Sequence, residues 1–384
     1  MSKWEKKKLG EIGNGYVGLT YSPEEVSESG IIVLRSGNIK DNKLDFTEIL
    51  RVKKELSEKL IIKNNDILIC ARNGSSRLVG KATLISETKE KMTFGAFMMI
   101  YRSDFNRYLV HYFHSLNFRR QLGNSATTTI NQITRKMLDS IVVPFPPSET
   151  QKHIAKTLDT AAELLAMRKQ QLEELDNLIN ATFYKMFGDP ISNERGWKKT
   201  RIGEFAKVET GATPDRGYIT YYRNGQIPWV KTGEVSKGYI TASEENISEI
   251  AIHETNCKVF PVNSVLIAMY GQGKTRGQAG LLHIAAATNQ ACAAIIPNNQ
   301  YNSEYLYRTL KISYQKVREM GRGGNQQNLN LSLVKMLEVP LPPLRIQNDF
   351  SKIVAKIEEQ KTLVKKIIRD TQNLIDALTE RYFK

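Results

Sequence analysis

One stretch in the second half of the chain has the residue types and spacing of a phosphate-binding loop. Ala268 is followed, after four residues, by Gly273, Lys274 and Thr275. In such a loop, backbone N–H groups cradle phosphate and the lysine neutralises charge. The loop must open into a helix, but residues 276–280, with glycines at 277 and 280, are poor helix starters. A phosphate-loop NTPase that uses residues 268–275 is therefore an alternative and not the favoured function.

The corresponding segment of the first half, residues 72–77, keeps glycine and positive charge, and both segments suit DNA contact. Arg and Lys neutralise phosphates or bind guanine, and Asn or Gln can pair with adenine. A second polar segment precedes each proline-rich stretch, at residues 124–131 and 321–328. The candidate DNA-contacting residues are Arg35, Asn38, Arg72, Asn73, Ser75, Ser76, Arg77, Thr128 and Asn131 in the first half, and Lys231, Thr232, Tyr270, Gln272, Lys274, Thr275, Arg276, Gln278, Arg322, Asn325, Gln326 and Gln327 in the second.

Signatures of catalysis are missing from the sequence. An adenine methyltransferase needs Asp or Asn before Pro-Pro and an aromatic residue after it, whereas this chain has Phe-Pro-Pro-Ser at 145–148 and Leu-Pro-Pro-Leu at 341–344. The five histidines show no triad or zinc spacing, and the three isolated cysteines are expected to be buried apolar residues. We expect no catalytic residue, no metal site and no cofactor bound by this chain.

The charge of the chain favours a polyanionic partner. The 384 residues carry a formal net charge of +15, and the excess lies mainly in residues 1–148 and 191–343, while 149–190 is slightly acidic. Two basic blocks predict two contact surfaces for a polyanion. No apolar stretch is long enough for a membrane helix, and the first residues do not form a signal peptide, so a cytoplasmic protein is expected.

The elements that would position these loops occur twice, because the chain is a tandem repeat. Five segments recur in the same order at a nearly constant offset. The matched segments are 4–12 with 197–205, 33–39 with 229–235, 68–82 with 266–279, 93–96 with 288–291, and 144–151 with 340–347. In each half, short β-type runs and one short helix, near 108–122 or 304–318, end at a proline-rich stop.

A long heptad pattern follows each stop and predicts a coiled coil. Gly188 is expected to cap the first of these helices at its C-terminus. The residues expected to pair the two helices are Leu158, Leu165, Leu172, Ile179, Ile357, Val364, Ile367, Leu374 and Leu378. The expected fold is α+β, a pseudo-twofold tandem repeat with two β-rich blocks, 1–147 and 189–343, separated by two long antiparallel helices, 148–188 and 344–384.

This order of motifs resembles the specificity (S) subunit of type I restriction–modification enzymes. The motifs are Trp-x4-Leu/Ile-Gly-Glu, a variable block, Val/Leu-Pro-x-Pro-Pro-x3-Gln and a long helix, all repeated over essentially the whole chain. Residues 227–234 and 288–292 are typical of target-recognition domains in that family. The first block departs from the pattern at Phe94 and Gly95, where the second has Asn289 and Gln290.

The resemblance implies a non-catalytic, sequence-specific subunit that binds double-stranded DNA. Each block would recognise one half of a bipartite, asymmetric target, and the helices would set the spacer. Two methylation subunits, which use S-adenosylmethionine at adenine N6, and up to two restriction subunits, which use ATP and Mg, are the implied partners. A coiled-coil scaffold without a DNA role stays open as another alternative.

Overall fold

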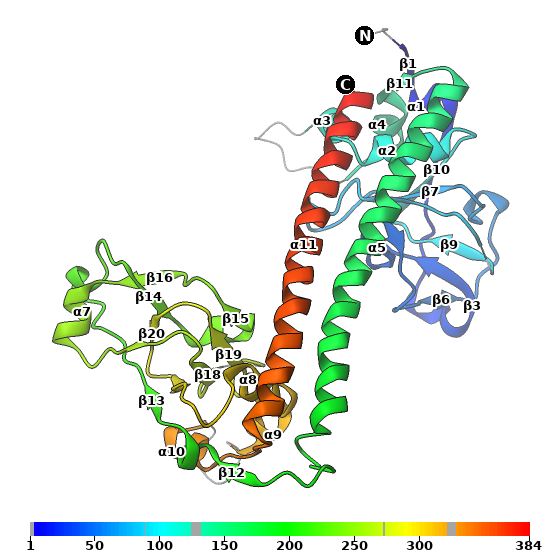
Figure 1. Cartoon of the computed structure of the whole chain (residues 1–384). Helices are drawn as coiled ribbons and strands as arrows, with labels where there is room; N and C mark the ends of the chain where they lie inside the picture. The colour runs from blue at the N-terminus through cyan, green and yellow to red at the C-terminus, as the bar shows by residue number, and fades with distance from the viewer. Residues whose placement is uncertain (1–3, 89, 124–131, 272, 321–327) are drawn as a thin grey trace. The chain divides into compact units, whose positions relative to one another are not determined.

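The chain, seen here as a computed structural model, forms two compact units. The structure describes residues 4–88, 90–123, 132–271, 273–320 and 328–384. The first unit contains Met1–Gln170 and Val364–Lys384, and the second contains Gln171–Leu363. Each unit therefore holds one β-rich block and one half of each long helix, α5 (Ser148–Phe187) and α11 (Leu344–Tyr382) (Figure 1). No helix among the described residues is long and apolar enough to cross a membrane.

The first block is built from two small sheets and a strand pair at its ends. The larger sheet has the order β2 (Asn14–Val17), β10 (Met98–Arg102), β7 (Ile67–Cys70), β8 (Ala82–Leu84), and the smaller has the order β6 (Arg51–Val52), β3 (Val26–Leu34), β9 (Met92–Phe94). The remaining strands are β1 (Glu5–Lys8) paired with β11 (Val142–Phe145), and β4 (Ile39–Lys40) paired with β5 (Lys43–Leu44). The helices are α1 (Leu9–Ile12), α2 (Asn106–Phe113), α3 (Leu116–Gln121) and α4 (Arg135–Ser140), with 3-10 turns η1 (Pro23–Glu25), η2 (Ser36–Asn38) and η3 (Glu58–Leu60).

The second block repeats this plan with additions. Its larger sheet has the order β13 (Val208–Thr210), β21 (Cys292–Ile295), β18 (Val265–Ala268), β19 (Ala279–Leu282), β15 (Tyr239–Ile240), and its smaller has the order β16 (Glu245–Ile247), β14 (Ile227–Val230), β20 (Ala286–Thr288), β17 (Val259–Phe260). Strand β12 (Lys199–Arg201) pairs with β22 (Glu338–Pro340). The helices are α6 (Ile202–Phe205), α7 (Glu249–Glu254), α8 (Ser303–Ile312), α9 (Tyr314–Glu319) and α10 (Leu331–Met336), with 3-10 turns η4 (Ile219–Tyr221) and η5 (Thr232–Lys237).

Hydrogen bonds at equivalent positions confirm the duplication. The Tyr108 hydroxyl donates to the carbonyl of Pro144, and the Tyr305 hydroxyl donates to that of Pro340. In each proline-rich stop a glutamine, Gln151 or Gln347, donates its side-chain amide to a proline carbonyl five residues earlier. These shared bonds fix where each long helix leaves its block.

The structure corrects two details of the sequence analysis. Each single short helix expected near 108–122 and 304–318 is two helices, α2 with α3 and α8 with α9. The repeat is also shifted by one residue at 93–96, because Leu34 pairs with Phe94 in β3–β9 whereas its counterpart Val230 pairs with Thr288 in β14–β20. Phe94 is therefore the counterpart of Thr288, and the turn residues 95–97 correspond to 289–291. Inserted residues elsewhere hid this shift from the sequence.

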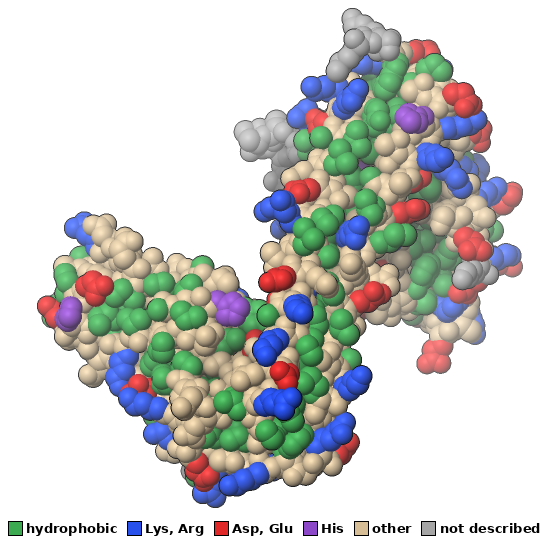
Figure 2. Space-filling view, viewed as in Figure 1, with side chains coloured by type: hydrophobic (Ala, Val, Ile, Leu, Met, Phe, Trp, Pro, Cys, Tyr) green, Lys and Arg blue, Asp and Glu red, His purple; other side chains and the backbone are tan. Residues whose placement is uncertain are grey.

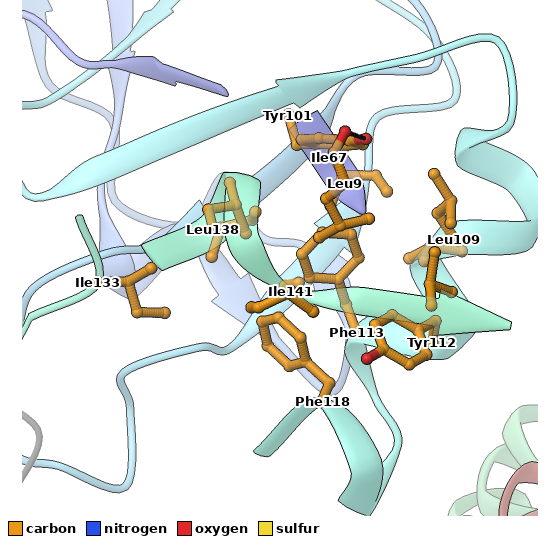
Figure 3. Close-up of a cluster of buried hydrophobic side chains, with 14 of the residues drawn as sticks. Leu9, Ile67, Tyr101, Leu109, Tyr112, Phe113, Phe118, Ile133, Leu138 and Ile141 are labelled. Atoms are coloured by element: carbon orange, nitrogen blue, oxygen red, sulfur yellow. Dashed lines mark hydrogen bonds between the residues drawn. The ribbon is translucent and has the colours of Figure 1, made fainter. Parts of the chain in front are cut away.

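The core of the first unit includes the ends of both helices. Strand β7 is buried on both faces, and its Ile67 and Ile69 face a cluster formed largely by α2, α3 and α4 (Figure 3). Ile154 and Leu158 of α5 join this cluster. Phe383, just after α11, completes it, with its ring centroid 5.3 Å from Tyr108 and 5.6 Å from Tyr112.

The second unit repeats this arrangement with the helices exchanged. Phe187, which ends α5, lies 4.6 Å from the ring of Tyr305, and Phe183 and Phe350 pack beside it. Each block is thus held by the start of its own following helix and by the end of the other helix. Gly188 then ends α5 with a positive φ of 74°, as its expected role as a C-cap requires.

Most of the residues expected to pair the two helices are buried or half-buried, and one is exposed. Leu158, Ile179, Ile357 and Val364 are buried, Leu165, Leu172, Ile367 and Leu378 are half-buried, and Leu374 is 54% exposed. A second row of buried or half-buried residues, spaced by seven along α11, consists of Val354, Lys361, Ile368 and Ile375. These are the repeat counterparts of Leu158, Leu165, Leu172 and Ile179. Lys361 hid this row from apolar periodicity, since its ammonium group is buried in an ion pair with Asp176 of α5.

Candidate DNA interface

Equivalent backbone contacts hold the polar loop of each block next to a strand turn. In the first unit, Ala71 and Arg72 donate their N–H groups to the carbonyl of Phe97, each at 2.9 Å. In the second, Met269 donates to the carbonyl of Ala291 at 2.8 Å. The β7–β8 loop therefore lies beside turn 95–97, and the β18–β19 loop beside turn 289–291.

The first loop presents polar and aromatic side chains together. The Arg72 guanidinium lies 5.3 Å from the ring centre of Phe97, whose side chain is 59% exposed. The Asn73 amide donates to the Ser36 hydroxyl at 3.3 Å, which joins this loop to the loop that carries Arg35. The exposed candidates beside them are Arg35, Arg72, Ser75, Ser76 and Arg77. Such a surface offers charge for phosphate and polar or apolar groups for base edges.

Asn38 differs from its neighbours because it is 3% exposed. Its amide nitrogen donates to the carbonyls of Asp45 and Glu48, both at 2.9 Å, and its oxygen accepts from the N–H of Arg35. All the hydrogen-bonding groups of this side chain face the protein. Asn38 thus braces the loop from inside, and its predicted contact with DNA is corrected by its burial.

The second loop, residues 269–278, is shaped by three glycines with positive φ, at 271, 273 and 277. The carbonyl of Lys274 accepts from the Tyr314 hydroxyl at 2.8 Å and from the Gln278 amide at 3.2 Å. Lys274 and Tyr270 are exposed, whereas Thr275, Arg276 and Gln278 are half-buried. The buried Nε of Arg276 has no hydrogen-bond partner among the described residues.

The structure does not support the phosphate-loop alternative. The chain leaves this loop through Gly277 into strand β19, which pairs antiparallel with β18. A phosphate loop places its anion at the N-terminus of the helix that follows, and no helix follows here. The resemblance to that pattern comes from glycines that a tight strand connection requires.

Lys231 and Thr232 lie where β14 ends, and both are engaged within the protein. The Lys231 ammonium lies 2.8 Å from Glu245 and 3.4 Å from Glu244, and the hydrogen bond that it donates to Glu245 raises the pKa of Lys231. Thr232 is 9% exposed and donates to the side-chain oxygen of Asn289 at 3.1 Å. These two carboxylates offset charge that Lys231 could otherwise offer to a phosphate.

Sequence reasoning did not include several residues that the structure adds to this surface. Exposed Gln290 accepts a hydrogen bond from the Thr213 hydroxyl, and no bond to its amide nitrogen occurs among the described residues. The Arg216 guanidinium lies 4.5 Å from the Tyr222 ring and 5.2 Å from Trp229, and bridges Glu245 at 2.7 Å. The signal for Gln290 was the departure of the first block from the family pattern. Once the repeat is corrected, the first block has Ala96 at the position that corresponds to Gln290.

Seven candidate residues lie outside the described residues: Thr128, Asn131, Gln272, Arg322, Asn325, Gln326 and Gln327. On the face drawn in Figure 2, Lys and Arg side chains occur on both units and are interspersed with Asp and Glu. Among the described residues, no group of His, Cys, Asp and Glu could hold a metal ion, and all three cysteines are buried with free thiols.

Comparison with known proteins identifies the family. The type I restriction modification DNA specificity domain matches this chain twice, at residues 1–177 and 194–370. The chain belongs to this family. It is therefore a type I specificity subunit, a DNA-recognition component that is not itself catalytic. The two matched segments also reproduce the tandem repeat.

Curated specificity subunits are similar to this chain along nearly its whole length. The MjaIX specificity subunit of Methanocaldococcus jannaschii is 23% identical, with 98% of this chain and 91% of the relative covered. The EcoKI specificity subunit of Escherichia coli K12 is 22% identical, with 94% and 84% covered. The S subunit from M. genitalium shares the fold with a TM-score of 0.60 at 17% identity, with 99% of this chain and 96% of the other covered. A second solved chain, from a study of type I system assembly, shares the fold with a TM-score of 0.63 at 16% identity and 98% coverage of that chain.

Proposed function

We propose that this specificity subunit recognises a bipartite, asymmetric sequence in double-stranded DNA, one half through each block. The observation that carries the proposal is that equivalent backbone contacts hold unlike side chains. Turn 95–97 presents Gly-Ala-Phe beside Arg72, whereas turn 289–291 presents Asn-Gln-Ala beside Tyr270. Different side chains at base edges select different bases, while phosphate contacts position the protein.

The two long helices would fix the distance between the half-sites. Helix α5 has 40 residues and α11 has 39, so each is about 60 Å long at 1.5 Å per residue. Half-sites contacted from one face of DNA are centred about one helical turn apart, or roughly 34–36 Å. A helix of this length can set such a spacing because it contains no proline or glycine.

Two methylation subunits are proposed to dock on the helices, and up to two restriction subunits to join them. The helices expose large apolar side chains at repeat-equivalent positions, two in each unit. Met167 of α5 and Leu374 of α11 belong to the first unit, and their counterparts Leu363 and Leu178 belong to the second. All four are about half exposed or more, and exposed apolar groups that recur in this way favour two copies of one protein partner.

The cofactors of the reaction are proposed to reside on these partners. S-adenosylmethionine would bind the methylation subunits, and ATP and Mg the restriction subunits. The role of this chain is then to hold the DNA so that the partner methylation subunits can reach adenine N6. The target adenine would be flipped by the partner, which requires DNA that is already bound in register.

Selection of duplexes from a randomised pool, with the full chain and its methylation subunits, tests the proposal. We expect two short sequence elements at a fixed spacing, with an affinity that falls steeply with salt. Arg77→Ala and Arg276→Ala should each degrade one element only, by about 1–3 kcal/mol where the arginine contacts guanine. Enrichment of no sequence by the assembled complex would support a scaffold without a DNA role instead.

An insertion tests the spacing role of the helices. Four residues added near Asn180, about one helical turn, should lengthen the selected spacer without changing either element. A spacer of unchanged length in a folded variant would contradict the role proposed for the helices.

A further inference from the structure

A network of charges with two buried cations, Arg308 and Lys361, joins the second block to both long helices. Arg308 of α8 is 3% exposed and lies at its centre. Its Nε lies 2.8 Å from Glu304 on the same helix, and its Nη2 lies 3.2 Å from Glu358 of α11. The network therefore begins on the second block and crosses to α11.

The network continues from α11 to α5. The Lys361 ammonium lies 2.8 Å from Glu358, which is one turn away on α11, and 2.6 Å from Asp176 of α5. Lys361 is 7% exposed. One continuous chain of ion pairs thus runs from Glu304 through Arg308, Glu358 and Lys361 to Asp176.

Tyr239 of strand β15 ties this chain to the sheet of the block. Its hydroxyl donates to Glu304 at 2.8 Å and accepts from Arg308 at 2.6 Å. Burial lowers the pKa of Arg308, but the charge of Glu304 and the contact with Tyr239 outweigh it and leave the pKa above its usual value. The guanidinium stays charged, so its geometry constrains every partner that it touches.

Ion pairs of this kind contribute more to geometry than to stability. Taking charges out of water costs several kcal/mol per ion, and the attraction between them offsets that cost only when the partners keep their positions. A small rotation of the block against the helices would break several of these contacts together. An apolar contact alone tolerates such rotation better, because it has no preferred direction.

We infer that Arg308, Glu358 and Lys361 are positioning residues that fix the angle of the second block on the helix pair, and hence the spacer that the subunit accepts. The inference rests on the proposed recognition of two half-sites. It assigns these residues no contact with DNA. Their loss should leave both half-sites intact and change only the tolerance for spacing.

The test measures binding of the full chain, assembled with its methylation subunits, to duplexes with the two selected half-sites one or two base pairs closer or farther apart. Arg308→Gln and Lys361→Gln should each reduce the preference for the natural spacer by roughly 2- to 150-fold, the range of coupling within one ion-pair network. Lys352→Gln is the matched control, because Lys352 of α11 makes only an exposed pair with Asp349. It should keep the full preference.

Two other results would decide against the inference. A lowered Tm with an unchanged spacer preference would show that the network only stabilises the fold. If Arg308→Gln does not fold, Glu358→Gln decides by the same measurement, since it removes the link to α11 and keeps the arginine. Wild-type protein that binds duplexes with and without the half-sites equally well would instead contradict the proposed function.

Discussion

Arg308 of the second unit and His111 of the first occupy equivalent positions, each three residues after the tyrosine that bonds the proline stop. Arg308 is buried and is part of a network of charges that reaches both helices and ends at Asp176, which is 53% exposed. The Nε2 of His111 lies 3.0 Å from Asp159 of α5, which is 54% exposed. At the repeat positions of Glu358 and Lys361, α5 carries Ala162 and Leu165, neither of which can form an ion pair.

The comparison separates what the repeat conserves from what it varies. Both units keep the hydrogen bond from tyrosine to a proline carbonyl, the hydrogen bond from glutamine to a proline carbonyl, and the phenylalanine from the other helix. These contacts are apolar or use the backbone, so they survive changes elsewhere. The charged contacts and the turn residues differ between the units, because the shared contacts form whatever side chains stand at those positions. The units therefore share a framework and differ in the charged contacts that join each block to the helices and in the side chains of the turns.

The shared aromatic contact should give the largest effects. Phe383→Ala should destabilise the first unit, and Phe187→Ala the second, each by about 3–5 kcal/mol, because each removes a buried ring from a packed cluster. Urea unfolding followed by near-UV circular dichroism measures the loss, and Leu374→Ala, at an exposed position, is the control. Unequal losses would show that the two units do not rely equally on the exchanged helix ends.

The dependence of stability on pH should give the next largest difference between the units. Burial lowers the pKa of His114 to about 4, and the position equivalent to His114 in the second unit is Lys311. Between about pH 6.5 and pH 4 the unfolded chain binds a proton that the folded chain does not, so stability falls as the pH falls, by up to about 3 kcal/mol. His114→Gln should flatten this dependence in chemical unfolding measured across that range. A slope unaffected by the substitution would mean that other groups cause it.

The turn residues should affect one half-site each. Gln290→Ala should degrade the element recognised by the second unit, and Phe97→Ala that of the first, by about 1–3 kcal/mol per lost base contact. The readout is the base composition of duplexes selected from a randomised pool. Gln300→Ala, an exposed glutamine of the same block, is the control. Loss of both elements from one substitution would contradict the assignment of one half-site to each unit.

The smallest effect is expected at the exposed contact of the first unit. Asp159→Asn should cost about 0–1 kcal/mol, since a solvent-exposed pair gains little from its charges. Chemical unfolding measures it, with Lys152→Gln on the same helix as a comparison. A loss well above 1 kcal/mol would show that this contact contributes more than an exposed ion pair.

Much of this architecture follows from the sequence because it depends on local pattern. The repeat, the β-type runs at β7 and β18, the two heptad helices, the helix end at Gly188 and the buried cysteines all leave periodic or conformational signals over a few residues. The second row of α11 could also have been found through the repeat, since Val354 and Lys361 correspond to Leu158 and Leu165. Apolar periodicity alone chose Leu374 because a charged residue interrupts the true seam.

The tertiary structure decided what comes together across long stretches of sequence. Only strand pairing shows that Phe97 lies beside Arg72, that Gln290 meets Thr213 and that Asn38 faces inward, because hydrogen-bond partners far apart in the chain leave no periodic signal. The exchange of helix ends, with Phe383 in the first core and Phe187 in the second, depends on packing of two antiparallel helices. The sequence by itself thus determined a duplicated framework, and the fold decided which side chains that framework presents.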